Sequence, residues 1–343
     1  MRRQMSVSPG YPGAAGKKLR RLPGDPGRGG QRHISFFERI DRFDGPQRSQ
    51  LRVVPVGAAP GGECYLLFAG GTTLLVDSGF QFCGPQLVEH LRRTLQGRAL
   101  DYILLTHSHY DHALGSVFCK QAWPEATVVA SRYAAGIFQK PHARVLMRRL
   151  DAYQAAQCGV TGAPDCIDAL RVDLPVENGD RISLDGDTIR IIALPGHTRC
   201  CIGFYLETHQ ILLAPETLGV PIPSGTVMPA YLVGYQMTLD AIAKAAQLPL
   251  RELLVSHAGM LYGPDCAAFL QRSAACCRQG CDLILGAYHP GVTMDELIAV
   301  FRRAFYPSDC PGLYPEMAFR TNVRVQIPLL LQECGGIDPA GLQ

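Results

Sequence analysis

The chain has 343 residues, is 47% apolar and carries a formal net charge of +3, so it can bury the core of one or two domains. No apolar run approaches the roughly 20 residues of a membrane-spanning helix, and we expect no membrane partner. Thirteen cysteines without a repeating framework argue against a secreted disulfide scaffold, and with the absence of a secretory signal they predict a cytoplasmic protein.

Residues 1–45 are predicted to form a disordered basic tail. Residues 1–33 hold eight Lys or Arg against one acid, Asp25, together with many Gly and Pro. Such a segment buries too little apolar surface to fold. A basic tail can attract nucleic acid, but we interpret this one as a leader without a role of its own, and no nucleic-acid partner is expected.

The first regular elements form a predicted hairpin followed by a helix. Residues 64–68 are typical of a strand, Gly70-Gly71 of a tight turn, and residues 72–76 of a returning strand that ends at Asp77. Pro85 opens an amphipathic helix that Gly97 closes. A strand over residues 102–105 then leads into a histidine-rich loop.

The second half repeats this order. Strands are predicted over 202–206 and 211–214, then an acid, Glu216, a helix beginning near Thr238, and a strand over 253–255 that ends at His257. Two halves, each a sheet covered by helices on one side, can bury their bare faces only against each other. The sequence therefore predicts an α/β fold, a four-layer αββα sandwich with its strand-end loops along one rim.

Three further segments complete the prediction. Residues 132–158 look helical and are expected over the rim, while strands over 181–184 and 188–194 form a hairpin that ends at Pro195-Gly196-His197. After residue 263 helical signals take over, with a capping box at Thr293-x-x-Glu296 and a further helix opened by Pro315. We expect a sandwich domain over 46–263 and a helical C-terminal extension over 264–343, serving as a structural cover or, alternatively, supplying substrate contacts.

The run His107-Ser108-His109-Tyr110-Asp111-His112 is the strongest signal of chemistry in the chain. In an extended segment alternate residues point the same way, so His107 and His109 can grip one ion while Asp111 and His112 turn towards a second. Imidazole nitrogens suit Zn²⁺, and three protein ligands leave a position open for water. The neighbouring cysteines, such as Cys200-Cys201, do not have the spacing of a zinc site.

These residues resemble the metallo-β-lactamase superfamily. The resemblance covers about residues 50–262 and rests on Thr106-His107-Ser108-His109-Tyr110-Asp111-His112, Leu194-Pro195-Gly196-His197-Thr198, Leu213-Ala214-Pro215-Glu216 and Ser256-His257. It implies two metal ions, most simply Zn²⁺ with Fe or Mn as alternatives. By that resemblance the first ion is held by His107, His109 and His197, and the second by Asp111, His112 and His257, with Glu216 between them.

Glu216 departs from the family pattern, which usually has a bridging aspartate there. The extra methylene moves the carboxylate outward, so three possibilities stay open: Glu216 bridges the ions, it supports a ligand from behind, or the site holds only one ion well. Asp77 looks like the family's acid beside the site, which acts through a ligand rather than on the metal.

The expected function is hydrolysis of a small ester, thioester or lactone by a metal-bound hydroxide, with Asp111 as the catalytic residue that orients it. Tyr231 and Tyr235 could donate to an oxyanion, although ordinary packing explains them more simply. The alternatives are a phosphodiesterase or nuclease of the same fold, and a metal-binding sensor with little turnover. The oligomeric state is left open.

Overall fold

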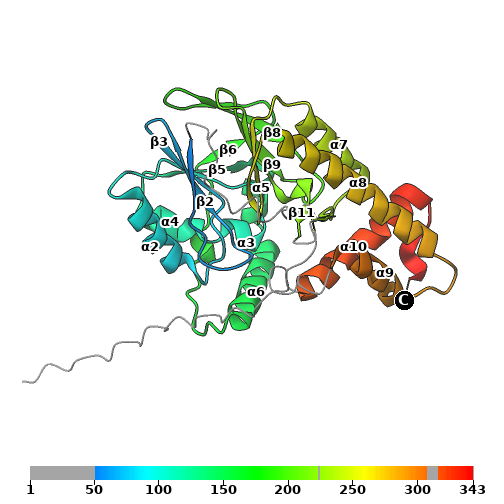
Figure 1. Ribbon diagram of the computed structural model, residues 1–343. Coiled ribbons are helices and arrows are strands. Elements are labelled where there is room, and N and C mark those ends of the chain that lie inside the picture. The colour runs from blue at the N-terminus through cyan, green and yellow to red at the C-terminus, as the bar shows by residue number, and fades with distance from the viewer. Residues whose placement is uncertain (1–50, 223–224, 307–315, 343) are drawn as a thin grey trace, which may run out of the picture. The chain divides into compact units, whose positions relative to one another are not determined.

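Two six-stranded β-sheets form the centre of the computed structural model, which describes residues 51–222, 225–306 and 316–342 (Figure 1). The predicted tail and Pro315 lie outside the described residues. The first sheet has the order β1-β2-β3-β4-β5-β6 and the second β14-β13-β10-β9-β8-β7. The first sheet comprises β1 (Arg52–Pro55), β2 (Tyr65–Ala69), β3 (Thr72–Val76), β4 (Tyr102–Leu104), β5 (Thr127–Ser131) and β6 (Leu174–Val176).

The second sheet repeats part of the first, as the sequence predicted. It comprises β7 (Arg181–Ser183), β8 (Thr188–Ala193), β9 (Ile202–Leu206), β10 (Ile211–Leu213), β13 (Glu252–Val255) and β14 (Gly259–Tyr262). An antiparallel pair is followed by a parallel strand in both sheets: β2-β3 then β4, and β9-β10 then β13. A short β11 (Val220–Pro221) and β12 (Val227–Met228) form a separate ribbon.

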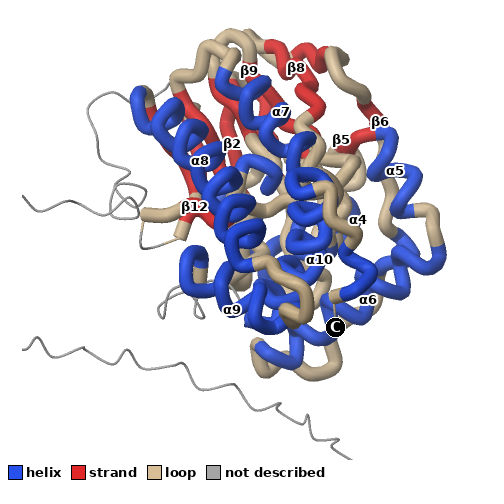
Figure 2. Tube along the Cα trace, turned by 90° about the vertical axis from the view of Figure 1, so that its right-hand side faces the viewer, coloured by secondary structure: helices blue, strands red, loops and turns tan. Residues whose placement is uncertain are grey.

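The helices cover the outer faces of both sheets, which confirms the predicted αββα sandwich (Figures 1 and 2). They are α2 (Gly84–Leu95), α3 (Tyr110–Ala113), α4 (Ser116–Ala122), α5 (Arg132–Phe138) and α6 (Pro141–Gln157) on the side of the first sheet. They continue with α7 (Tyr235–Ala246), α8 (Pro264–Ala287), α9 (Met294–Phe305) and α10 (Glu316–Gly335) on the side of the second.

Side chains from both inner faces fill the space between the sheets. Leu74 and Leu104 of the first sheet share one buried cluster with Phe204 and Leu213 of the second. Leu87 and Leu91 of α2 pack in another cluster on the outer face of the first sheet. The central strands are therefore buried on both sides, which explains why they are nearly continuous apolar runs, whereas the edge strands β1 and β7 are partly exposed.

The segment 132–158 differs from the single helical stretch suggested by the sequence. It forms α5 and α6, which are separated at Gln139 and Lys140 because Pro141 restricts its predecessor to extended backbone and opens a new helix. Helix α6 packs against α3, and the Asp151 carboxylate of α6 accepts a hydrogen bond from the backbone N–H of Gln81 at 2.8 Å. This helix therefore supports the histidine-rich loop.

The C-terminal helices share their core with the sandwich. Phe269 of α8, Phe301 of α9 and Phe319 of α10 belong to the same buried cluster as Leu212 and Leu253 of the second sheet. The capping box of α9 is present, with Thr293 and Glu296 bonding each other's backbone N–H. None of the described helices is both long and apolar enough to cross a membrane.

Gly115 is required where the loop after β3 approaches the loop that carries the candidate ligands. A Cβ atom at residue 115 would lie 1.9 Å from the Ser78 carbonyl oxygen, while its backbone is ordinary helical, with φ −64° and ψ −18°. Ser78 in turn donates its backbone N–H and its hydroxyl to the His112 carbonyl, at 2.7 and 2.9 Å. Close packing here fixes the distance between Asp77 and His112.

Gly115→Ala is therefore expected to lower the free energy of unfolding by about 3 kcal/mol, because the added methyl forces the two loops apart. Urea unfolding monitored by circular dichroism measures the change. Gly136→Ala is the matched control, since a Cβ there meets nothing within 4 Å in α5 and should leave stability unchanged or raise it. Equal unfolding midpoints for the two variants would contradict the packing argument.

Candidate metal centre

Seven predicted ligand side chains converge at one end of the sandwich, each from a loop that follows a strand. His107, His109, Asp111 and His112 follow β4, and the remaining three follow β8, β10 and β13: His197, Glu216 and His257. Their ligand atoms form two groups, His107-His109-His197-Glu216 and Asp111-His112-His257, and within each group the atoms lie within 4.8 Å of one another. Segments up to 150 residues apart in sequence thus supply one cluster.

The first group is compact and almost fully buried. His197 Nε2 lies 2.9 Å from His109 Nδ1 and 2.9 Å from Glu216 Oε2. His107 Nε2 lies 3.8 Å from the same glutamate oxygen. Three imidazole nitrogens and one carboxylate oxygen therefore point into a common space.

The second group lies beside the first. His112 Nε2 is 3.2 Å from His257 Nε2 and 3.7 Å from Asp111 Oδ2. The rings of His107 and His112 have their centroids 4.1 Å apart, so the two groups are in contact.

Glu216 faces both groups through one oxygen. Its Oε2 lies 3.8 Å from His112 Nε2 and 3.9 Å from His257 Nε2, in addition to its contacts with His197 and His107. The carboxylate is 4% exposed and sits in the short 3-10 helix Glu216–Leu218 directly after β10. The longer glutamate side chain thus still reaches the middle of the cluster.

Groups behind the rings fix which imidazole nitrogen faces inward. The Nδ1–H of His112 donates to Asp77 Oδ2 at 2.8 Å, and the Nδ1–H of His197 donates to the Ala230 carbonyl at 2.6 Å. Because a carboxylate or carbonyl oxygen can only accept, Nδ1 carries the proton and Nε2 keeps its lone pair for the cluster.

Glu63 does the same for His257 and was not singled out by the sequence analysis. Its Oε2 accepts the Nδ1–H of His257 at 2.7 Å. Nothing in the spacing marks Glu63, because it precedes the first predicted strand and meets His257 only through the packing of the two sheets. Glu63 and Asp77 each accept the Nδ1–H of a histidine ligand, but the sequences around them are not alike.

Asp77 connects His112 to a second histidine. Thr106 donates its backbone N–H to Asp77 Oδ1 at 2.8 Å, and the Thr106 hydroxyl lies 3.0 Å from His107 Nδ1. Asp77 and His257 also adopt left-handed backbone, with φ of 54° and 62°, which costs free energy at a residue other than glycine. This strain turns both side chains from the strand ends into the cluster.

A buried thiol joins two of the ligand loops. The backbone N–H of Ser108 donates to Cys200 Sγ at 3.3 Å, and the Cys200 Sγ lies 3.0 Å from the Thr198 hydroxyl. Ser108 stands between His107 and His109, and Thr198 follows His197. Cys200 therefore holds the two loops of the first group together, a role that its sequence context did not indicate.

The ionisation of the cluster suits cation binding. Burial lowers the pKa of His107 well below its ordinary value, and burial with the nearby His197 lowers the pKa of His109 to about 3, so both rings are neutral at pH 7. Burial opposes ionisation of Glu216, but the adjacent His197 holds the pKa of this carboxyl well below its usual range. Metal binding needs neutral imidazoles and a charged carboxylate, which is the state of His107, His109 and Glu216. Burial opposes protonation of His112 and His257, but the neighbouring carboxylates raise the pKa of both rings, so a cation would displace protons there.

A cation fits the donor set better than hydrogen bonding does. His107 Nε2 and Asp111 Oδ1 are buried and have no hydrogen-bond partner among the described residues. Buried polar atoms normally have partners, and a cluster of lone pairs facing one another requires a positive charge between them. Histidine with carboxylate ligands suits Zn²⁺, and Fe or Mn as well.

The two tyrosines considered as oxyanion donors lie in the core. Tyr231 is fully buried and its ring meets Tyr235 edge-on, at a centroid distance of 5.7 Å. Burial raises the pKa of Tyr231, and the thiols of Cys277 and Cys281 raise it further, which places its hydroxyl near α8. Packing, the simpler interpretation from the sequence, accounts for both rings, although the buried Tyr231 hydroxyl has no hydrogen-bond partner among the described residues.

Comparison with known proteins gives one family and several distant relatives. Residues 59–257 match the family model described as the metallo-beta-lactamase superfamily. A hydroxyacylglutathione hydrolase from Prochlorococcus marinus is 26% identical over 167 residues, which are 48% of this chain and 48% of that one. An atrochrysone carboxyl ACP thioesterase from Aspergillus novofumigatus is 25% identical over 218 residues, 61% of this chain and 54% of that one.

A solved structure shares the fold more completely. The crystal structure of a metallo-beta-lactamase family protein from Thermus thermophilus covers 83% of this chain and 94% of its own, with a TM-score of 0.58 and 22% identity. The chain spans about half the length of the curated relatives it matches.

Glu63→Ala is expected to weaken metal binding roughly 10- to 100-fold, because His257 loses the acceptor that orients its ring. Competition with a chromogenic chelator measures the affinity. His209→Ala is the matched control: His209 also pairs with a carboxylate, Asp187, but lies outside both ligand groups. Unchanged affinity in the Glu63 variant would show that His257 needs no such support.

Proposed function

The chain belongs to the metallo-beta-lactamase superfamily, and from this premise we propose that it is a metal-dependent hydrolase of thioesters. One observation carries the proposal: two groups of ligand atoms meet at Glu216 Oε2, with His107 Nε2 and Asp111 Oδ1 buried and without partners among the described residues. The names of two relatives, a hydroxyacylglutathione hydrolase and an ACP thioesterase, support the substrate class.

We propose that His107, His109 and His197 hold one cation and that Asp111, His112 and His257 hold a second, with Glu216 shared. When bound, two such cations, most simply Zn²⁺, would lower the pKa of a water molecule towards neutrality and would polarise a carbonyl oxygen. No serine or cysteine nucleophile is then needed. A small-molecule substrate is the partner that this chemistry requires.

Asp111 is proposed as the catalytic residue. Its Oδ2 faces His112, while its Oδ1 has no partner among the described residues and is available to the attacking water molecule. Burial raises the pKa of Asp111, whereas a bound cation would lower it, so the assignment rests on the position of Oδ1. Asp111 therefore orients the water molecule and takes up its proton at Oδ1.

The leaving group favours a thioester over an amide. A thiol has an ordinary pKa of about 8.5, so a thiolate departs near neutral pH without being protonated first. An amine leaving group must be protonated as it departs, so the proton that Asp111 takes up would have to be passed on to the amine nitrogen before the bond breaks. The site is thus better suited to thioesters and activated esters.

The sharing of Glu216 can be tested by metal content. Glu216→Gln should reduce the number of bound ions per chain and weaken those that stay, because the carboxylate oxygen meets ligands of both groups. His257→Ala, which removes a ligand of the second group only, should lose one ion and keep the other. Elemental analysis after dialysis measures both, and full metal content in the Glu216 variant would refute sharing.

The activity is tested with a panel of substrates on the zinc-loaded protein. We expect thioesters to be hydrolysed with the highest kcat/KM, ahead of p-nitrophenyl esters, lactones and bis-p-nitrophenyl phosphate. His109→Ala should lose metal and at least about 100-fold in kcat/KM, since it removes a ligand of the first group. His142→Ala, an exposed histidine of α6, is the matched control and should keep both.

Two outcomes would overturn the proposal. Hydrolysis of the phosphate diester without the thioesters would indicate a phosphodiesterase. A protein that binds metal and turns over no member of the panel would be a metal-binding sensor.

A further inference from the structure

Helix α6, on the side of the first sheet, turns apolar side chains to solvent (Figure 1). Leu146 and Val145 are 53% and 52% exposed, Leu150 is 37% exposed and Tyr153 is 36% exposed. Leu146, Leu150 and Tyr153 are spaced i, i+4 and i+7, so they form one row along the helix, with Val145 in the row beside it. Single exposed apolar residues are common, but a group on one element marks an interaction surface. These four residues are called the α6 face.

The buried side of α6 fixes the rotation of the helix. It comprises Met147, Asp151 and Ala155, and the Asp151 carboxylate accepts the backbone N–H of Gln81 at 2.8 Å. Turning the helix to bury the α6 face would withdraw this acceptor and leave a buried N–H without a partner, which costs free energy. The α6 face is therefore held outward, although it carries larger apolar side chains than most of the buried side.

The charges around the α6 face are basic. Residues 132–157 contain five Lys or Arg and one acid, Asp151, which is 1% exposed. Three of the five cations pair with acids of neighbouring segments. The other two, Lys140 and Arg149, are exposed, and their side chains have no partner among the described residues. Arg149 follows Val145 by one turn, so its charge lies within the apolar group.

This combination suits the surface of an anionic bilayer better than other partners. A two-fold contact with a second copy would bring the same unpaired cations together, because each surface then meets itself. A nucleic acid would pair with the cations but leave the aliphatic side chains without an apolar partner. At a bilayer the aliphatic groups enter the boundary between headgroups and acyl chains, tyrosine suits the interface, and Lys and Arg reach lipid phosphates.

We propose that the α6 face, together with Lys140 and Arg149, binds the surface of a bilayer that contains anionic phospholipids. The prediction of no membrane partner rested on the lack of a spanning segment, which does not bear on binding at a surface. The inference goes beyond the proposed hydrolysis and does not depend on it. Because α6 packs against α3, which carries Asp111 and His112, binding would bring the histidine-rich loop close to the lipid.

Cosedimentation with vesicles tests the proposal on the full chain. One set of vesicles consists of phosphatidylcholine, and the other of equal parts phosphatidylcholine and phosphatidylglycerol. We expect the protein to sediment with the anionic vesicles and much less with the neutral ones, and the partition coefficient to fall as salt is added. No binding to the anionic vesicles at physiological salt would overturn the proposal.

The contribution of the cations is tested by Lys140→Gln combined with Arg149→Gln. The partition coefficient should fall about fivefold for each residue, because each loses its attraction to the anionic surface. Arg98→Gln combined with Arg251→Gln is the matched control. Both arginines are exposed and precede β4 and β13, whose opposite ends lead to the metal centre, so this pair should change binding little.

The contribution of the apolar groups is tested by Leu146→Ser combined with Leu150→Ser, which should lower the partition coefficient at least about tenfold. Val325→Ser, at a 43% exposed position of α10, is the matched control and should leave it unchanged. Fluorescence then reports contact directly. Brominated phospholipid should quench the tryptophan of Leu146→Trp, whereas Trp123, the single tryptophan of the natural chain, should not be quenched in the wild type.

Two further results would overturn the inference. Equal binding by the wild type and by both α6 pairs would place the contact elsewhere, such as in the basic residues 1–33. Binding to heparin or to a single-stranded oligonucleotide, without binding to vesicles, would indicate a polyanion as the partner. All substituted side chains of α6 are exposed, and circular dichroism verifies that each variant is folded.

Discussion

The buried charge of Glu216 is the constraint on which the site depends. A carboxylate that is 4% exposed loses most of its hydration, which is costly unless a positive charge lies close by. Of the four imidazole nitrogens within 3.9 Å of Oε2, that of His107 belongs to a ring that burial keeps neutral, whereas for His257 burial opposes protonation but Glu216 and Glu63 raise the pKa well above its ordinary value. A cation bound among them compensates the charge of Glu216 and uses the lone pairs of the rings at the same time.

The fold meets this constraint through strand ends. Strands β4, β8, β10 and β13 all deliver their following loops to one rim, so ligands far apart in sequence arrive without long excursions of the chain. The outer partners Asp77 and Glu63 come from the β2-β3 side of the first sheet, and each bonds the Nδ1–H of a ligand ring. The left-handed backbone at Asp77 and His257 is the local cost of turning these side chains inward.

Local pattern predicted the elements well and tertiary contacts poorly. The strands 72–76 and 202–206 were predicted with the bounds that the structure has, because each has a turn at one end and a run of buried residues. Strand β5 was missed, and α5 and α6 were merged, since the effect of Pro141 outweighs the helical composition around it. All seven predicted ligands lie in the cluster, but their role in metal binding stays a prediction. Glu63, Cys200 and the Ala230 carbonyl act only through contacts between distant segments, for which the sequence holds no local signal.

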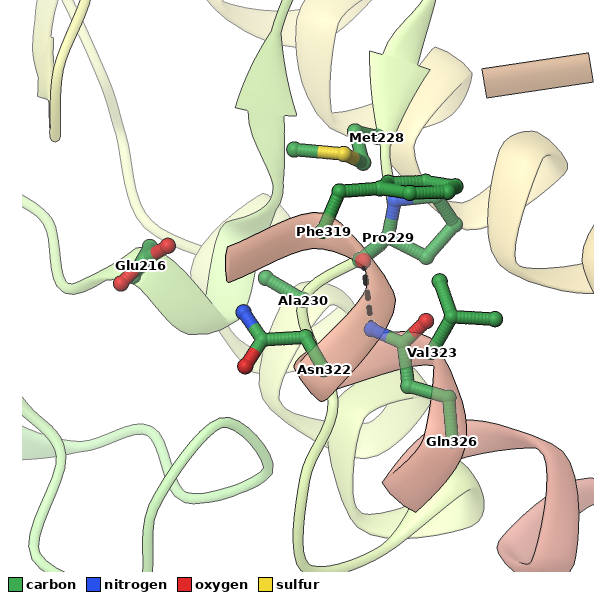
Figure 3. Close-up of a pocket in the computed structure, with 8 residues that line it drawn as sticks. All are labelled: Glu216, Met228, Pro229, Ala230, Phe319, Asn322, Val323 and Gln326. Atoms are coloured by element: carbon green, nitrogen blue, oxygen red, sulfur yellow. Dashed lines mark hydrogen bonds between the residues drawn. The ribbon is translucent and has the colours of Figure 1, made fainter. Parts of the chain in front are cut away.

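The C-terminal helix is connected to the cluster through two successive backbone carbonyls. Gln326 of α10 bonds the Pro229 carbonyl, and the next carbonyl, that of Ala230, accepts the Nδ1–H of His197. The same short segment thus orients a proposed ligand on one side and packs against α10 on the other (Figure 3). Residues of α10 reach this segment from outside the two sheets, so changes in the C-terminal helices can act on the surroundings of His197 without altering the proposed ligands. A superfamily fold with one kind of metal centre can in this way serve different substrates by changing the helices that close its rim.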